Sequence, residues 1–407
     1  MLNVVIINGG RGAATLIPAL LRQQGLNVTS VVNAYDDGKS TGEIRRFFGM
    51  LGPSDIRKVQ ELLLPENDPD HAVHLNLFRY RYPNASDRDS ILAALQAFAA
   101  GAAPDLVGLH FSNDKVNKAL RCFVREFLNG LAGIEKARGE QFDFGDCSVM
   151  NCIFAGAFLT FDRNIETATR YIDRLFKLKG TVLPISIEDK KLVALRENGE
   201  MLYCEADIVE LRSNVRIERV FLLDGSLDKS RFEDLSIEEK RYYLDRHHCF
   251  VSVSQGVRLA IQQADIIIYS AGTQHSSLYP TYLTAGLAET IADNRALKVF
   301  ITNIGADYET PSYKASDYIL GAYRYLCLSD SRTYAMPELF DAILINRSDH
   351  KAKADDTYVF FDQEAFDDIP VRRVVDAFES IEQPGKHDGD RLVQTILSLY
   401  EEATELQ

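Results

Sequence analysis

Two adjacent aspartates begin the stretch of this sequence whose residue types are best suited to chemistry. Asp36 and Asp37 are followed directly by the letters GKSTG, so carboxylates, a lysine, hydroxyl groups and glycines stand within seven positions. Paired carboxylates can hold Mg²⁺, directly or through water, or accept a hydrogen bond from a ribose hydroxyl. Groups that could bind phosphate come next, on Gly38, Lys39, Ser40 and Thr41. The alternative is an acidic surface turn that caps a helix.

A glycine-rich turn near the N-terminus is a second candidate site. The apolar run at residues 4–7 is typical of a strand buried in a parallel sheet, and a helical pattern begins at residue 13 or 14. The letters NGGRG separate the two and supply Gly9, Gly10, Arg11 and Gly12. Such glycines let the backbone turn sharply, and the first N–H groups of the following helix can then bind phosphate. The spacing matches neither GxGxxG nor GxxxxGK[ST], so tight packing of the turn is an equal alternative.

A further turn of small residues, SAGT at 270–273, follows the strand-like run ADIIIY. This turn and the serines just beyond it are suited to a phosphate or a sugar, with Gly272, Thr273, Ser276 and Ser277 as the candidate residues. Another apolar run, residues 297–302, ends at Asn303. We include Asn303 because ligands of open parallel sheets bind beyond the carboxyl ends of the strands.

Two other polar residues have competing interpretations. Asp55 follows the turn GPS, where a helix cap is the more frequent role and a metal ligand is the alternative. Asn151 lies within the apolar pattern at 149–161, which predicts a helix. A buried amide in such a helix needs partners, and the backbone and a bound ligand are equally suitable.

The elements that must position these residues alternate along the chain. Strand patterns at residues 4–7, 28–32, 264–269, 297–302 and 341–345 are separated by helical patterns. This alternation predicts an α/β, Rossmann-like fold, a doubly wound and mostly parallel sheet with helical insertions. In such a sheet the turns that follow the strands meet at one edge, so the candidate turns should face one another.

The domain organisation follows from the same pattern. We expect one elaborated domain over residues 1–407, with helical insertions near residues 84–145 and 200–250. The charged run at 228–246 is typical of an exposed helical insertion or lid. Less regular segments predict a strand at 106–111, a small antiparallel excursion from residues 181–187 and 192–195 with the turn Asn198-Gly199, a continuous helix at 278–292 and a short strand at 357–361.

The composition argues against several classes of partner. Lysine and arginine number 45 against 59 aspartates and glutamates, which gives a formal net charge of −14. This balance argues against nucleic-acid binding and against an anionic membrane surface. No apolar stretch is long enough for a membrane helix, and no basic leader opens the sequence. The six cysteines form no C-x-x-C pair, as expected of reduced thiols in a cytoplasmic protein, and homo-oligomerisation is a general expectation.

The motifs taken together resemble a known family. GGRG, DDGKSTGEIR, GPSDIRK, LFRYRY and SVMN occur in this order, and ADIIIYSAGT, KVFITN, YETPSY and HDGDRL continue the match. The whole chain is similar to the 2-phospho-L-lactate transferase (CofD-like) superfamily. Within it, the motifs that resemble the bacterial gluconeogenesis-factor branch more than the deazaflavin-cofactor enzymes are DDGKSTGEIRR, GPSD and LFRYRY.

The resemblance implies a Rossmann-like domain that binds nucleoside-diphosphate compounds. The transferases use a guanosine-diphosphate-activated lactate, which a deazaflavin hydroxyl attacks with the assistance of Mg²⁺. The other branch is associated with nucleotide-sugar binding and with control of carbon metabolism and cell shape. By this resemblance, Asp36 and Asp37 would hold metal or acceptor, Asn151 would contact the nucleotide, and the diphosphate would face Gly9, Gly10, Gly12, Gly272 and Thr273.

The candidate segments depart from the family pattern at several positions, and SAGT at 270–273 stands where the family usually has GPGS. Asn8 and Met150 replace usual glycines, Arg11 replaces a threonine, and Lys39 replaces another glycine. Arg11 and Lys39 add cations where phosphates should lie, which could strengthen anion binding or fill the site. The leading hypothesis is a binder of a nucleoside-diphosphate metabolite, most simply a nucleotide-sugar. The alternatives are a Mg²⁺-dependent transferase, with Asp37 and Asp55 at the metal, and a scaffold whose site has decayed.

Overall fold

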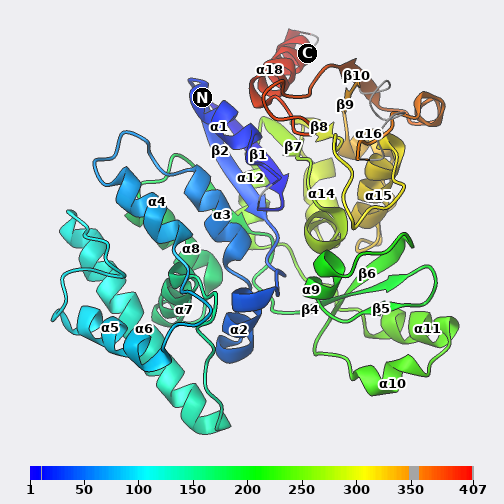
Figure 1. The fold of residues 1–407 in the computed structure, drawn as a ribbon. Coiled ribbons are helices and arrows are strands. Elements are labelled where there is room, and N and C mark those ends of the chain that lie inside the picture. The colour runs from blue at the N-terminus through cyan, green and yellow to red at the C-terminus, as the bar shows by residue number, and fades with distance from the viewer. Residues whose placement is uncertain (11, 348–356, 406–407) are drawn as a thin grey trace.

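Seven parallel strands form the central sheet in the part of the chain that the structure describes (Figure 1). The computed structural model describes residues 1–10, 12–347 and 357–405. The strands are β1 (Leu2–Asn8), β2 (Leu26–Val32), β3 (Thr181–Pro184), β7 (Ile266–Tyr269), β8 (Leu297–Ile301), β9 (Ala342–Asn346) and β10 (Arg372–Asp376). Their order across the sheet is β10-β9-β8-β7-β1-β2-β3, and every neighbouring pair is parallel. The α/β, Rossmann-like prediction is therefore confirmed.

The register of the central strands brings the candidate turns together. In β1, residues 4–7 are at most 1% exposed, as expected for a strand covered on both faces. Asn8 at the end of β1 pairs with Val32 at the end of β2, and Ile7 pairs with Tyr269 at the end of β7. The turns after these three strands therefore begin at the same edge of the sheet.

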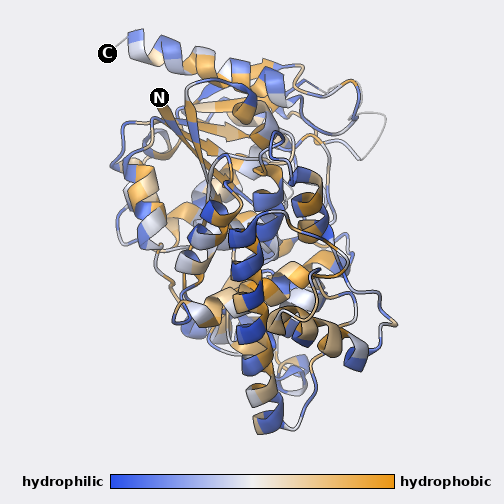
Figure 2. Cartoon of the chain, turned by 90° about the vertical axis from the view of Figure 1, so that its left-hand side faces the viewer, coloured by the Kyte–Doolittle hydropathy of each residue, from blue (hydrophilic) through white to orange (hydrophobic). Residues whose placement is uncertain are grey.

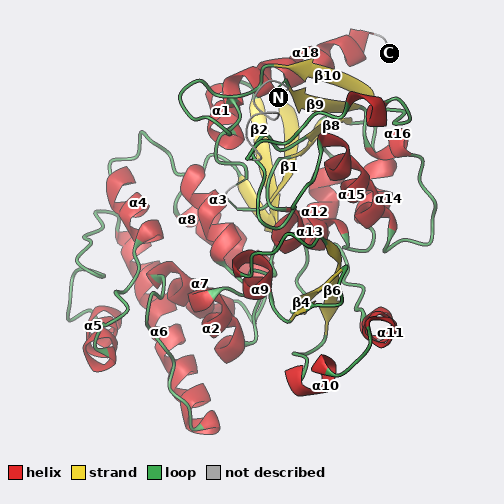
Figure 3. Ribbon diagram, turned by 45° about the vertical axis from the view of Figure 1, so that its right-hand side comes forward, coloured by secondary structure: helices red, strands yellow, loops and turns green. Residues whose placement is uncertain are grey.

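Helices surround the sheet and form a separate region beside it (Figures 1 and 3). The first half of the chain contains α1 (Leu16–Arg22), α2 (Lys39–Phe48), α3 (Ser54–Leu62), α4 (His71–Arg79), α5 (Arg88–Ala100), α6 (Asp114–Arg138), α7 (Val149–Thr160) and α8 (Ile165–Leu175). The second half contains α9 (Glu205–Glu210), α10 (Lys229–Glu233), α11 (Ile237–His247), α12 (Gln255–Gln262), η1 (Gln274–Leu278), α13 (Tyr279–Tyr282), α14 (Leu287–Ala292), α15 (Ala315–Cys327), α16 (Met336–Leu339), η2 (Gln363–Phe366) and α18 (Gly389–Glu405). No helix within the described ranges is long and apolar enough to cross a membrane.

The C-terminal helix α18 illustrates how these helices pack. Its buried residues are Leu392, Val393, Ile396 and Leu399, a spacing that places them on one helical face. Figure 2 accordingly shows bands of hydrophobic and hydrophilic colour along this helix. Asp388 accepts a hydrogen bond from the Arg391 backbone N–H at 3.1 Å, as expected of a residue that caps the helix.

A second, three-stranded antiparallel sheet lies beside the main one. It consists of β4 (Lys191–Arg196), β5 (Met201–Leu202) and β6 (Ile217–Leu223), in the order β5-β4-β6. The antiparallel excursion predicted from residues 181–187 and 192–195 and the turn Asn198-Gly199 is confirmed only in part: β4 pairs antiparallel with β5 across that turn, whereas β3 joins the main sheet parallel to β2. The reason is burial: β3 is covered on both faces and therefore suits the edge of a parallel sheet flanked by helices.

Three local predictions also differ from the structure. Residues 106–111 form only an isolated bridge between Leu106 and Leu109, and residues 357–361 form isolated bridges rather than a strand. The helix expected at 278–292 is broken, because Gly286 adopts a left-handed conformation at φ +80°. Strand β10 was not predicted, since its arginines and aspartate obscure the apolar pattern of an edge strand.

A buried carboxylate joins α3, α8 and β3. Asp173 on α8 is 6% exposed and accepts hydrogen bonds from the Gln60 side chain at 2.6 Å and from the Val182 backbone at 3.0 Å. Burial raises the pKa of Asp173 to about 7, against 3.8 for the ordinary group. The native state therefore holds a proton that the unfolded chain releases between these two pH values.

Because the folded pKa of Asp173 is raised, its contribution to stability is complete below pH 3.8 and is lost as the pH rises through 7. We expect this group to lower the free energy of unfolding by about 1 kcal/mol between pH 6 and pH 8.5. Asp173→Asn mimics the protonated acid and should remove this part of the pH dependence. Urea denaturation at both pH values tests the expectation, and equal pH dependence in the two proteins would contradict it.

Candidate functional site

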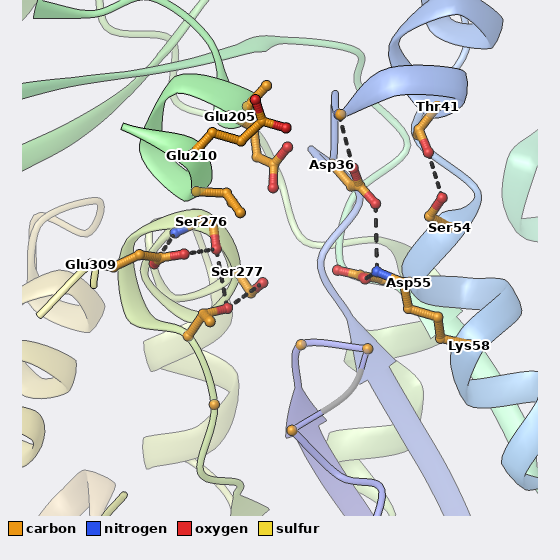
Figure 4. A pocket seen from close by; sticks show the side chains of 18 of the residues that line it. Asp36, Thr41, Ser54, Asp55, Lys58, Glu205, Glu210, Ser276, Ser277 and Glu309 are labelled. Carbon is orange, nitrogen blue, oxygen red and sulfur yellow. Dashed lines mark hydrogen bonds and ion pairs between the residues drawn. The ribbon is translucent and has the colours of Figure 1, made fainter. Parts of the chain in front are cut away.

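A cavity of about 710 Å³ opens at the carboxyl edge of the main sheet (Figure 4). Its size lies in the range typical of small-molecule sites. The turns after β1, β2, β7 and β8 contribute to its wall, together with α3 and α9. The predicted residues that line it are Gly9, Gly10, Gly12, Asp36, Gly38, Lys39, Thr41, Asp55, Gly272, Thr273, Ser276, Ser277 and Asn303. Segments far apart in the sequence thus converge on one hollow.

The first glycine turn combines close packing with backbone donors that the described part of the protein leaves unused. A Cβ on Gly12 would lie 2.3 Å from the Ala271 carbonyl oxygen, so the close approach of two turns requires glycine there. The backbone N–H groups of Gly9 and Gly10, however, donate no hydrogen bond to another described residue. These two donors stand at the cavity, where an anion could accept from them. Arg11 lies outside the described residues, so its predicted contact stays a prediction.

The turn after β2 divides its two aspartates between different surroundings. Asp36 lines the cavity and accepts a hydrogen bond from the Gly38 backbone at 3.1 Å. Asp37 does not line it: its carboxylate lies 3.2 Å from the Lys191 Nζ and 3.7 Å from an Arg45 Nη1. The pair with Lys191 attaches the turn to β4, and the two cations together neutralise the negative charge of Asp37. The catalytic or metal-binding role of Asp37 stays a prediction.

Two other predicted contacts lie below the surface of the cavity. Ser40 is 4% exposed, and its hydroxyl accepts a hydrogen bond from the Asn151 side-chain amide at 3.1 Å. Asn151 is fully buried in α7 and does not line the cavity. Its place in the structure favours the internal alternative: the amide fixes the start of α2 against α7. The predicted nucleotide contacts of Ser40 and Asn151 stay predictions.

A lysine lies between the two carboxylates on the α3 side of the cavity. The Lys58 Nζ lies 2.8 Å from an oxygen of Asp55 and 3.7 Å from an oxygen of Asp36, as Figure 4 shows. Burial raises the pKa of Asp36, and the neighbouring charge of Asp55 raises it further. Excess negative charge at this point favours a bound cation.

The carboxylates of the cavity can be compared with the ligands that Mg²⁺ requires. Within the part of the chain that the structure describes, no three histidine, cysteine, aspartate or glutamate side chains are grouped to hold one ion. Mg²⁺ is usually held by one or two carboxylates together with substrate phosphates and water, so such a group is not required. Asp36 and Asp55 therefore fit a metal that arrives with a phosphorylated ligand.

The second small-residue turn is occupied by an internal carboxylate. Glu309 accepts hydrogen bonds from the backbone N–H groups of His275 and Ser276, both at 2.9 Å, and from the Ser276 hydroxyl at 2.5 Å. Burial raises the pKa of Glu309 to about 7. The Gly272 N–H likewise donates to the Asn303 side chain at 3.0 Å. Several hydrogen-bond donors of this turn therefore already bond to Glu309 and Asn303 and not to a ligand.

Several residues of the cavity were not predicted as site residues. They are Ser54, Lys58, Arg81, Asp146, Glu205, Ala206, Val209, Glu210, Gly305, Asp307 and Glu309. Lys58 and Glu309 lie within the motifs GPSDIRK and YETPSY, so the motif match was a usable signal for these two. Helix α9 comes from the segment around the three-stranded sheet, and no local pattern indicates that it reaches the cavity.

Lys39 adopts a conformation that favours glycine. Its φ is +41°, in the left-handed region, and the residue lines the cavity at the start of α2. Lys39→Gly should raise the free energy of unfolding by about 1 kcal/mol, because a side chain in this region is strained. The same change should weaken binding of a nucleoside diphosphate about fivefold, by the loss of a screened attraction. Thermal unfolding and calorimetric titration measure the two effects, and a loss of stability would contradict the first.

Comparisons with known proteins agree with this architecture. A family model described as 2-phospho-L-lactate transferase CofD matches residues 4–378. A putative gluconeogenesis factor from Nostoc sp. is 23% identical over 98% of this chain and 68% of its own length. A gluconeogenesis factor from Halalkalibacterium halodurans is 24% identical over 78% of this chain and 71% of its own length.

The fold has also been solved for a similar protein. The crystal structure of protein BH3568 from Bacillus halodurans matches with a TM-score of 0.65 and 22% sequence identity. The match covers 97% of this chain and 99% of that one, so the arrangement extends over nearly the whole length. Because the family model covers most of the sequence, the chain belongs to the 2-phospho-L-lactate transferase CofD family.

Proposed function

We propose that the cavity binds a nucleoside-diphosphate metabolite and that a nucleotide-sugar is its best candidate. The observation that supports this most strongly is the pair of unused backbone donors, Gly9 N–H and Gly10 N–H, at the edge of a cavity of about 710 Å³. Backbone N–H groups of a glycine turn after a parallel strand are suited to a pyrophosphate. Lys39 adds a positive charge at the start of α2, while Lys58 and Arg81 on the same wall are in ion pairs with Asp55 and Asp146.

The start of α2 offers a second set of donors. The backbone N–H groups of Lys39 and Ser40 donate no hydrogen bond to another described residue. The first N–H groups of a helix attract anions, so a second phosphate is suited to this position. We expect a cytoplasmic protein in which ligand binding regulates carbon metabolism or the use of cell-envelope precursors. Of these roles, the name gluconeogenesis factor of two relatives supports only the one in carbon metabolism.

Calorimetric titration tests this proposal. The ligands are uridine and guanosine diphosphates and their hexose conjugates, each with and without Mg²⁺. We expect saturable binding of at least one nucleotide-sugar and no turnover of it during the titration. An absence of binding across both nucleotide series would contradict the proposal and leave only the scaffold alternative.

The carboxylates of Asp36 and Asp55 favour a second candidate function, a Mg²⁺-dependent transfer of a phosphoryl-linked group to a hydroxyl acceptor. Both side chains line the cavity on the side of the α2 donors. A bound Mg²⁺ would neutralise charge on the diphosphate, while the free N–H groups would hold the phosphate oxygens. Asp36→Asn should abolish such turnover, whereas metal-independent binding without turnover supports the regulator.

A further inference from the structure

A second cavity, of about 250 Å³, lies where the three-stranded sheet meets α13 and α15 (Figure 1). The Tyr325 hydroxyl there accepts a hydrogen bond from the Val220 backbone N–H at 3.1 Å and so joins α15 to β6. The wall of the second cavity includes His275 of η1, whereas the next two residues, Ser276 and Ser277, line the first cavity. The two cavities therefore meet different residues of η1 and have no described lining residue in common.

Three tyrosines and a histidine give the second cavity an aromatic wall. The rings of Tyr279 and Tyr325 are stacked with their centroids 4.1 Å apart, and the His275 ring stands edge-on to Tyr279 at 4.9 Å. Tyr313 also lines the cavity, with its hydroxyl 3.5 Å from the His275 Nε2. Such a wall favours an aromatic ligand, because offset and edge-on ring pairs attract each other beyond the area that they bury. A cavity of roughly 150 Å³ can hold a benzene ring, so this one has room for a ring with two small substituents.

The inner end of the second cavity has two polar groups without a partner. Tyr279 and His275 are each 1% exposed, and neither the Tyr279 hydroxyl nor the His275 Nδ1 forms a hydrogen bond with a described residue. The Tyr279 hydroxyl reaches the cavity at Gly321, where a Cβ would overlap it. Burial lowers the pKa of His275 to about 3, so its ring is neutral and one of its nitrogens can accept a hydrogen bond. Because buried polar groups are costly to leave unpaired, a hydroxyl group of a ligand is suited to this end.

The outer end of the second cavity offers a positive charge. Arg324 on α15 lines it and is exposed, and within the described ranges its guanidinium forms no hydrogen bond and no ion pair. Two other charged residues of this rim are already paired: Arg216 lies 3.3 Å from Asp317, and Glu218 is in an ion pair with α11. The remaining acid, Glu197, is exposed to solvent. Arg324 can therefore pair with a carboxylate at the mouth of the cavity.

We propose that the second cavity binds a small aromatic carboxylic acid. The ring lies among the tyrosines, a hydroxyl substituent bonds to the Tyr279 hydroxyl at the inner end, and the carboxylate pairs with Arg324 at the outer end. The proposal does not depend on the function proposed for the first cavity, because the two sites share no described lining residue. A suitable probe is para-hydroxybenzoate, which carries the hydroxyl and the carboxylate on opposite sides of one ring.

Calorimetric titration of the full chain with para-hydroxybenzoate, benzoate and phenol tests this proposal. We expect para-hydroxybenzoate to bind with a dissociation constant of about 1 mM or lower. Tyr279→Phe should weaken para-hydroxybenzoate about fivefold and leave benzoate unchanged, since only the first probe has a hydroxyl to bond. Arg324→Gln should weaken both acids about threefold and leave phenol unchanged, because the lost attraction is that of an exposed ion pair. Tyr279→Phe should fold normally, because it removes a hydroxyl that has no described partner.

Arg295→Gln is the matched control, because Arg295 is an exposed arginine that lines neither cavity. It removes the same formal charge and should leave the affinity for every probe unchanged. An absence of para-hydroxybenzoate binding up to about 10 mM would overturn the proposal and leave water as the partner of the inner groups. Unchanged affinity in both Tyr279→Phe and Arg324→Gln would overturn it as well, by placing the bound acid elsewhere on the chain.

Discussion

Gly156→Ala should lower the free energy of unfolding by about 3 kcal/mol, the upper end of the usual cost of overpacking. Gly156 lies in α7, where it is packed against α6. A Cβ there would lie 1.8 Å from the Phe123 carbonyl oxygen and 2.6 Å from its carbonyl carbon. Both obstacles belong to the backbone, so the two helices must move apart and the side chains between them lose contact.

Gly133→Ala is a control for this substitution. Gly133 lies on the exposed side of α6, and a Cβ there meets nothing within 4 Å. The change should raise stability by up to about 1 kcal/mol, because alanine is a better helix former than glycine. Urea denaturation of the two variants measures both effects, and a similar loss in each would show that close packing of α6 and α7 is not the cause.

Gly10→Val should weaken binding of a nucleoside diphosphate about 100-fold, since hydrogen bonds to a charged group are each worth about 1.5–3 kcal/mol. A Cβ on Gly10 would lie 2.5 Å from an oxygen of Asp55 and 2.9 Å from the Cδ of Lys58. Both neighbours are side chains that can shift, so the fold should survive. The branched side chain would nevertheless cover the free N–H groups of the turn and displace the pair on α3.

Gly225→Val provides the comparison for this change. Gly225 is exposed, and a Cβ there meets nothing within 4 Å. Calorimetric titration should find unchanged affinity in Gly225→Val and the large loss in Gly10→Val, while circular dichroism shows both folded. Wild-type affinity in Gly10→Val would mean that the glycines of this turn serve packing alone.

The fold could be predicted from the sequence where a strand is a continuous run of apolar residues. Runs such as residues 4–7 and 266–269 are apolar on both faces, which identifies a parallel sheet covered by helices. Apolar runs could predict neither the presence of strand β10 nor the pairing of β3 with β2. An edge strand keeps polar residues on its surface, and strand partners depend on contacts far apart in the sequence.

The site could be predicted only as a set of turns. The rule that ligands bind beyond the carboxyl ends of parallel strands located Gly10, Asp36 and Gly272 at one cavity. It could not decide between Asp36 and Asp37, because a turn of the backbone sends one carboxylate to the cavity and the other to Lys191. Nor could it find Glu205, whose helix reaches the site from a separate sheet.

The most direct test of the account is a measurement at the amides of the first turn. The chain contains 25 glycines, so selective ¹⁵N-glycine labelling gives a simple spectrum in which Gly10 is identified by its absence from Gly10→Val. Titration with a nucleotide-sugar that binds should shift the Gly9 and Gly10 amide resonances more than those of distant glycines such as Gly225. Saturable binding that leaves the Gly9 and Gly10 resonances in place would contradict the claim that this turn holds the diphosphate.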